Sequence, residues 1–194
     1  HANVMVASSE KEPQQGWPYD VVLAPLASVP STSATSWASW TVDAYHQASP
    51  LHYTLSAVDL QAVADLDDEV SALADALAAH PSLFPSIEGV RQEAQGFGDP
   101  AFRDMLDLSI RLGQMPGAPG EVVAASDALA VALQGAILHN RAQASHLGAN
   151  GLSIYLPPSG GGLDCAYFDN DALWSASTRW DDLLAAFCHA DCGI

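Results

Sequence analysis

The alternation of strand and helix that sets the fold class is clearest in Tyr53-Thr54-Leu55-Ser56-Ala57-Val58-Asp59-Leu60. The first six of these residues are mostly apolar or β-branched, which predicts a buried strand. Asp59 then stands where a helix N-cap belongs. The helix is expected to run to about Ala79, because an apolar stripe recurs at helical spacing until His80-Pro81 ends it.

Further strands and helices are expected on both sides of this junction. The predicted strands are Asn3–Ala7 and Gly151–Leu156, and the predicted helices are Ser36–Gln47, Ile87–Gln95, Ala101–Arg111, Glu121–Ala144 and Arg179–Ala190. Strands that alternate with helices predict an α/β fold with a mostly parallel sheet flanked by helices. Three strands make a poor sheet for a chain of this length, so part of the sheet is expected to be missing.

The composition excludes several function classes. The 194 residues include 23 acidic and 6 basic side chains, which gives a formal charge of −17. A surface for nucleic acid or for an anionic membrane would need a basic footprint instead. No apolar run approaches the roughly 18 residues of a spanning helix. Because the chain starts at His1 without a Met, we expect a processed product or a fragment.

The cysteines all lie in the last part of the chain, at Cys165, Cys188 and Cys192. An odd number leaves at least one thiol that is free or that pairs outside the chain. A local disulfide is favoured if the protein is secreted. An internal Cys/His dyad is disfavoured, because Cys188 and His189 are adjacent and diverge on a helix. Cys165 with His139 or His146 would need the fold to bring them together.

Several blocks of sequence, taken in order, resemble one peptidase family. They are Val6-Ala7-Ser8-Ser9-Glu10-Lys11-Glu12-Pro13, Gly16-Trp17-Pro18-Tyr19-Asp20, Leu55–Leu60, Arg91–Phe97, Asp104–Leu108, Gly151–Pro157 and Tyr167–Leu184. Their order and spacing are similar to those of the clostripain family of cysteine peptidases. The resemblance implies a caspase-like α/β fold and covers nearly the whole chain.

The chain departs from this family where the catalytic residues should be. The family's strand ending in His-Gly and its Asp-Ala-Cys turn are both absent, and His1 is followed by Ala2 rather than Gly. The resemblance therefore implies the C-terminal part of such a peptidase and assigns no catalytic residue to it. We treat residues 1–194 as a single region: 1–58 with the core strands and a groove loop, 59–148 helical, and 149–194 with the last strand and helix.

The resemblance implies that this chain contributes a wall of the substrate groove. The residues expected beside a bound peptide are Ser8, Ser9, Glu10, Lys11, Glu12 and Trp17. Family members cut after Arg or Lys, and a cationic side chain needs a carboxylate partner. A supporting acid of the family would lie near Gln14 and Gln15, where this chain carries amides, so Glu10 and Glu12 become the candidate acids. The alternatives are solvated loop charges for the two acids and a core anchor for Trp17.

The implied partners are an N-terminal chain of the same peptidase, which carries the dyad, and a peptide or protein substrate. The implied location is secreted or in a bacterial cell envelope, and neither nucleic acid nor membrane is an expected partner. No metal site is assigned. Some family members depend on Ca²⁺, and Asp65–Asp68 and Asp164–Asp171 offer oxygen ligands, although a solvated helix face is the competing interpretation of the first stretch.

Three hypotheses compete at this stage. The first is a portion of a clostripain-like cysteine endopeptidase, and the second is a non-catalytic peptide-binding or scaffold protein derived from the same fold. The third is an unrelated acidic α/β protein. The third would gain if Leu152–Tyr155 formed no strand in a sheet beside Val4–Ala7.

Overall fold

The main sheet joins three strands that are far apart in the sequence. The computed structural model describes residues 2–12, 16–48, 53–161, 163–169 and 177–188. In it, β1 (Val4–Ala7), β2 (Thr54–Asp59) and β4 (Ile137–Ala142) lie in the order β1-β2-β4. Both pairings are antiparallel, with Val6 opposite Ala57 and Ala57 opposite His139. The central strand β2 is buried from Thr54 to Val58, whereas neither outer strand has a buried residue.

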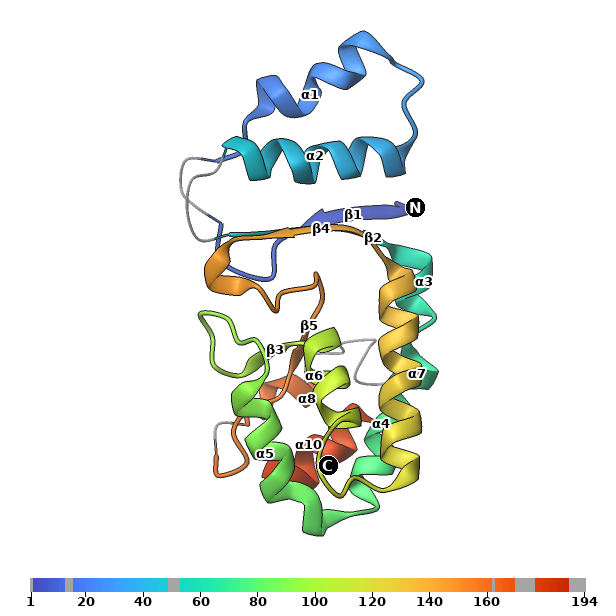
Figure 1. Cartoon of the computed structure of the whole chain (residues 1–194), viewed down its shortest axis with the longest axis vertical. Helices are drawn as coiled ribbons and strands as arrows, with labels where there is room; N and C mark the ends of the chain where they lie inside the picture. Colours follow the sequence, from blue (N-terminus) through green and yellow to red (C-terminus); the bar gives the residue numbers. More distant parts are fainter. Residues whose placement is uncertain (1, 13–15, 49–52, 162, 170–176, 189–194) are drawn as a thin grey trace.

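Two helices cover one face of this sheet. Helices α1 (Tyr19–Ser28) and α2 (Ala34–Ala48) lie together on the side away from the rest of the molecule (Figure 1). Helix α2 contacts all three strands and buries Ala38, Val42 and Tyr45 against them. Helix α1 contacts α2 and buries only Val22. We call β1, β2, β4, α1 and α2 the sheet region.

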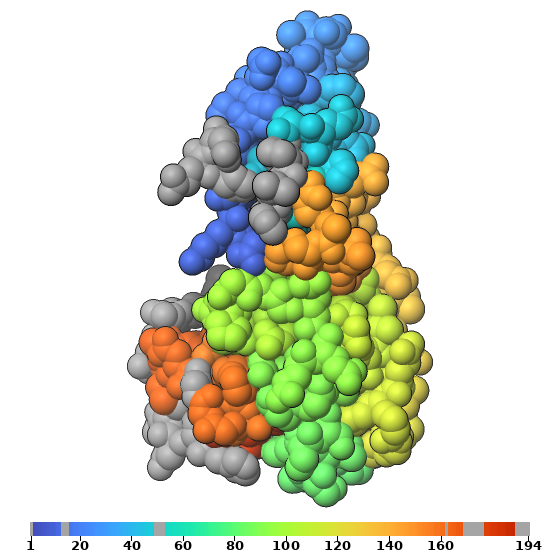
Figure 2. Space-filling model, turned by 60° about the vertical axis from the view of Figure 1, so that its left-hand side comes forward, coloured from blue at the N-terminus to red at the C-terminus, as the bar shows by residue number. Residues whose placement is uncertain are grey.

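The other elements form a wider body below the sheet, which we call the helical region (Figure 2). It contains α3 (Leu60–Ala64), α4 (Asp67–Ala78), η1 (Pro81–Leu83), α5 (Phe84–Glu93), β3 (Phe102–Asp104), α6 (Met105–Gly113), α7 (Gly120–Ala136), η2 (Ala144–His146), β5 (Ser153–Tyr155), α8 (Ala166–Asp169) and α10 (Trp180–Cys188). Helices α4, α6, α7 and α10 enclose the larger apolar core. Trp180 is buried in it, and its indole Nε1 donates to the carbonyl of Tyr155 at 2.8 Å.

A polar joint links the helical region to the sheet, where the side-chain amide of Asn140 on β4 donates to the carbonyl of Ala149 at 2.7 Å. Asp104 is fully buried and accepts hydrogen bonds from the main-chain N–H and the side-chain amide of Asn150, at 2.6 and 2.9 Å. Next to Asn150, Gly151 has a φ of +124°, and a Cβ there would lie 2.7 Å from the hydroxyl of Ser56 on β2. Only glycine combines this backbone conformation with so close an approach. The run Gly151–Pro157 therefore begins where the two regions meet.

The prediction of a mostly parallel sheet is wrong for the described residues, although the α/β class is confirmed. All their strand pairings are antiparallel. The strand at Gly151–Leu156 is confirmed as β5, but it pairs with β3 in a separate sheet and not beside Val4–Ala7. The error arises because a strand followed by a helix predicts a parallel return, whereas the sequence does not reveal which strands become neighbours.

Three predicted helices have different bounds in the structure, and strand pairing explains two of these differences. The helix expected over Glu121–Ala144 ends at Ala136, and the chain continues as β4 because its main chain pairs with β2. The helix expected over Ala101–Arg111 begins only at Met105, after β3. The helix expected from Asp59 to Ala79 is divided into α3 and α4. The predicted end of the last helix at Ala190 lies outside the described residues.

Candidate functional site

The groove loop, residues 8–12, follows β1 and is held by one buried side chain. Thr54 opens β2, and its hydroxyl oxygen accepts from the main-chain N–H of Ser9 and Glu10, at 3.0 and 3.2 Å. The Ser8 hydroxyl lies 3.0 Å from the same oxygen and donates to the carbonyl of Glu10 at 2.7 Å. Thr54 is 1% exposed. It therefore sets the course of the loop, a role that the sequence analysis did not assign to it.

The carboxylate of Glu10 fastens this loop to the helical region. Its Oε2 accepts from the main-chain N–H of Gly98 at 2.7 Å and lies 3.5 Å from Nε2 of His146, while Oε1 accepts from the N–H of Lys11 at 2.7 Å. Burial raises the pKa of Glu10, but the hydrogen bonds from Lys11 and Gly98 and the nearby His146 outweigh it and hold that pKa below its usual value. Glu10 thus stays ionised and is already engaged by the protein.

The remaining predicted groove residues point in different directions. Lys11 and Glu12 are exposed, and Glu12 accepts from the indole Nε1 of Trp17 at 2.7 Å. The ring of Trp17 packs on Tyr45 with centroids 5.6 Å apart, next to the core of the sheet region. The structure therefore brings Ser8, Ser9, Glu10 and Lys11 together and places Trp17 where it anchors the end of the loop.

A cavity of about 220 Å³ lies between the groove loop and the segment before β3. We call it the groove-loop cavity; it is lined by Ser9, Glu10, Lys11, Phe97, Gly98, Asp99 and Phe102. The ring of Phe97 stacks on that of His146, 6.3 Å away and nearly parallel, and Phe102 packs against Tyr155. No local pattern marks the residues from 97 to 102 as part of the site, because they approach the loop only through contacts about 90 positions apart in sequence.

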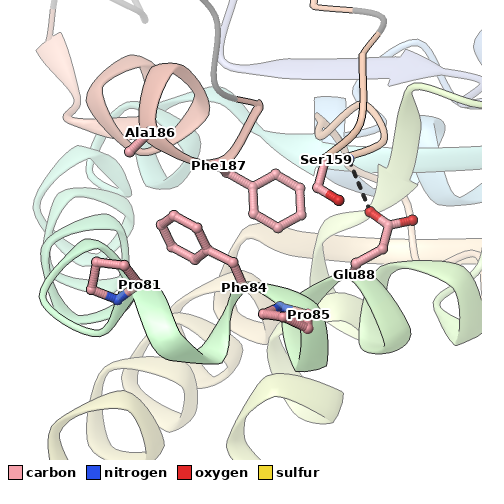
Figure 3. A pocket seen from close by; sticks show the side chains of 7 residues that line it. All are labelled: Pro81, Phe84, Pro85, Glu88, Ser159, Ala186 and Phe187. Atoms are coloured by element: carbon pink, nitrogen blue, oxygen red, sulfur yellow. Dashed lines mark hydrogen bonds between the residues drawn. The ribbon is translucent and has the colours of Figure 1, made fainter.

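Two larger cavities have mostly apolar linings. The first, of about 720 Å³, lies between α5 and α10, where the rings of Phe84 and Phe187 meet (Figure 3). Its one charged lining residue, Glu88, is held by Arg91, Gln92 and the N–H of Ser159. The second, of about 350 Å³, is an apolar hollow between β1, α1 and α2 that includes Trp17 in its wall. Neither offers a free reactive group among the described residues.

The described cysteines do not form a nucleophilic site. Cys165 is disulfide-bonded. Cys188 is a buried free thiol, and burial raises its pKa, which disfavours the reactive thiolate. His139 lies 2.9 Å from Asp43, and His146 is the neighbour of Glu10. Cys192 and His189 lie outside the described residues.

The described residues also bear on the calcium prediction. No group of three or more His, Cys, Asp or Glu side chains is arranged to hold a metal ion in this part of the chain, which includes Asp65–Asp68. The second candidate stretch, Asp164–Asp171, extends beyond the described residues at its end. Within the ranges that the structure describes, no helix is both long and apolar enough to cross a membrane.

The chain belongs to the clostripain family, whose family model matches residues 1–106. This range includes β1, the groove loop, Thr54 and the whole lining of the groove-loop cavity. It sets aside the hypothesis of an unrelated protein, even though β5 lies outside the main sheet. The comparison with the sequences of characterised proteins gives no match.

Solved structures extend the likeness beyond the range of the family model. A clostripain from Bacteroides thetaiotaomicron ATCC 29148, in complex with a peptide inhibitor, superimposes with a TM-score of 0.58 at 14% identity, over 91% of this chain and 76% of that one. A secreted C11 cysteine protease from the same species, with an irreversible peptide inhibitor, gives a TM-score of 0.57 at 16% identity over 92% of this chain. This chain spans about half of that protease, 53% of its length.

Proposed function

We propose that this chain is the C-terminal portion of a clostripain-like cysteine endopeptidase and forms one wall of its substrate groove. The observation that carries the proposal is the groove loop, which Thr54 and Glu10 hold beside a cavity within the range matched by the family. The thiolate nucleophile and the proton-shuttling histidine would come from an N-terminal chain of the same peptidase. The reaction would be hydrolysis of a peptide bond, after Arg or Lys.

The charge of the molecule suits such a substrate. The chain carries a formal charge of −17, so its field attracts a basic peptide. The main-chain N–H groups of Ser9, Glu10 and Lys11 are already engaged within the chain. An extended substrate would therefore pair with carbonyl groups of the groove loop, in the manner of β-strand addition. Ser9 and Lys11 line the cavity beside that path, whereas Ser8 and Glu10 hold the loop in place.

The surface offered to the N-terminal chain is the open side of the sheet region. Among the described residues, β1 has β2 on one edge and no strand on the other. Near it, α1 exposes large apolar side chains of the kind that a helix packed on a globular core normally buries: Tyr19 is 64% exposed and Leu23 47%. Burying this patch and pairing the free strand edge would stabilise an assembly of the two chains.

Reconstitution tests the proposal. Residues 1–194 are produced together with the upstream polypeptide of the parent protein, and cleavage of Lys and Arg reporter peptides is followed with and without a reducing agent. We expect thiol-dependent cleavage that is lost when the upstream cysteine is replaced. Leu23→Asp should abolish co-purification of the two chains, while Val131→Asp, an equally drastic change at a 69% exposed position of α7, should not. A stable assembly without thiol-dependent cleavage would contradict the proposal.

The second candidate function is a non-catalytic peptide-binding or scaffold protein of the same fold. It is favoured by one observation, that the described cysteines are either disulfide-bonded or buried with a raised pKa. It predicts peptide binding by the assembly without turnover. A secreted or cell-envelope location agrees with the disulfide at Cys165, and calcium dependence is checked by cleavage before and after chelation.

A further inference from the structure

We propose that the groove-loop cavity is a subsite for a cationic side chain of the bound peptide, with Asp99 as its carboxylate. The inference rests on the proposed function in that the cavity opens beside the substrate path. It assigns a role to a residue of the helical region that the groove-loop prediction did not contain. By the family resemblance, the primary pocket acids lie in the missing turn and near Gln14 and Gln15, so Asp99 would contact a different position of the peptide.

Asp99 is the lining acid that remains available to a ligand. Both carboxylate oxygens of Glu10 are already in contact with Lys11, Gly98 and His146. Asp99 is exposed, and its Oδ1 accepts a single bond from the N–H of Ala101 at 2.9 Å. Its Oδ2 accepts no hydrogen bond from the residues that the structure describes. A carboxylate with one fixed and one open oxygen is oriented and still able to receive an N–H donor.

The walls of the cavity suit the flat or elongated stem of Arg or Lys. Phe97 and Phe102 line it, and each ring is braced by another, Phe97 by His146 and Phe102 by Tyr155. A cation beside aromatic faces gains free energy in addition to its ion pair, most of all when it is Arg. A volume of about 220 Å³ is large enough for one such side chain.

Lys11 is the one basic residue in the lining of the groove-loop cavity, and it is exposed, so its side chain can move aside when a cationic ligand enters. The cavity carries two acids and one base, so its lining has a net charge of −1. No described carboxylate lies within ion-pair distance of the Lys11 ammonium. Lys11 can therefore swing into solvent, and an incoming cation meets Glu10, which is kept ionised, and Asp99.

The test is a direct binding measurement on residues 1–194, which needs no nucleophile. A blocked tripeptide with a central Arg is titrated against the chain and compared with the same peptide carrying citrulline, which keeps the shape and loses the charge. Calorimetry gives the affinities, and the Gly98 amide resonance reports occupation of the cavity. We expect Arg to bind about fivefold more tightly than citrulline, as for a partly exposed ion pair with aromatic walls.

Two variants separate the effect of the Asp99 charge on binding from any effect of the substitution on the fold. Asp99→Asn keeps the oxygen that accepts from Ala101 and should bring the two affinities within about twofold of each other. The matched control is Asp164→Asn, because Asp164 is exposed and likewise accepts from an N–H two residues ahead, that of Ala166 at 3.0 Å; it should leave the preference for Arg unchanged.

The titration can contradict the proposed subsite in three ways. Equal affinity of the wild-type chain for the two peptides, absence of binding by the Arg peptide at millimolar concentration, or an unchanged preference in Asp99→Asn would each overturn the inference. The proposed function is tested by a different readout, which is thiol-dependent cleavage by the reconstituted assembly. That cleavage would persist even if the groove-loop cavity proved not to be a subsite. A preserved Arg preference without cleavage would instead favour the peptide-binding alternative.

Discussion

The helical region and the sheet region differ in how they bury their apolar side chains. The helical region encloses residues such as Trp180, Phe187 and Leu133, each at most 1% exposed, in one continuous core. The sheet region has a far smaller core around Tyr45 and Tyr53. Its helix α1 buries one residue and leaves several large apolar ones in solvent. The helical region can thus stabilise itself, whereas the sheet region leaves apolar surface for a partner to cover.

The largest expected effect comes from the core of the helical region. Leu133→Ala on α7 removes a fully buried side chain, so it should lower the free energy of unfolding by about 3 kcal/mol. Val131 lies two residues away on the same helix and is 69% exposed, and Val131→Ala should cost less than about 0.5 kcal/mol. Denaturant titration of both variants measures the difference. Similar costs would show that α7 is not packed as described.

The next largest effect is expected at the joint between the two regions. Asp104→Ala removes a buried carboxylate that caps α6 through the N–H of Asp107 and also binds Asn150, so buried donors lose their partner. We expect a loss of about 2 kcal/mol, from the cap and the unsatisfied groups together. The control is Asp59→Ala, which removes a partly exposed cap of α3 and should cost about 1 kcal/mol. If Asp104→Ala lowers the free energy of unfolding no more than Asp59→Ala does, the structural role assigned to Asp104 at the joint is wrong.

A smaller effect is expected where the sheet region holds the groove loop. Thr54→Val keeps the shape of the side chain and removes the hydroxyl that serves Ser8, Ser9 and Glu10. The free energy of unfolding should fall by about 1 kcal/mol, and the amide signals of the loop should shift. Thr32→Val removes only a local bond to the carbonyl of Val29, so it should change both readouts little. Unshifted loop signals in Thr54→Val would refute the anchoring role.

The smallest effect is expected from the titration of Glu10. Its pKa lies below the usual 4.5 because hydrogen bonds from Lys11 and Gly98 outweigh burial, so its ionised form stabilises the folded chain. That contribution is complete above pH 4.5 and is lost as the pH falls through the lowered value. Asp43 and Glu88 behave alike, since their pKa values are also lowered. Unfolding followed below pH 4.5 should therefore show a shallower slope in Glu10→Gln, and an identical slope would exclude this contribution.

The sequence predicted the parts of the fold that depend on local signals. The strand at Tyr53–Val58 and the Asp59 cap were found because β-branched residues and a capping aspartate act on their own neighbours. Strand β4 was predicted as helix, since the apolar spacing of α7 continues through Ile137 and only the pairing with β2 ends it. Strand direction and the neighbours of β5 depend on long-range pairing, which single-sequence patterns do not encode.

The candidate site divides in the same way. Glu10 and its neighbours were found through the family resemblance of a contiguous block. Thr54, Asp99 and His146 were missed because each approaches that block from a distant part of the chain, and their individual residue types are unremarkable for a strand start or a loop. No local sequence pattern distinguishes His146, yet its side chain is only 14% exposed, between Glu10 and Phe97.

Hydrogen exchange of residues 1–194, alone and with the upstream polypeptide, tests the central claim most directly. The amides of β1 and α1 should exchange faster than those of α6 and α7 in the isolated chain. On assembly, protection should rise in β1 and α1 and stay unchanged in α7. Unchanged exchange in β1 and α1 while the two polypeptides co-purify would contradict the account, because the exposed side of the sheet region would then not be the surface that the partner covers.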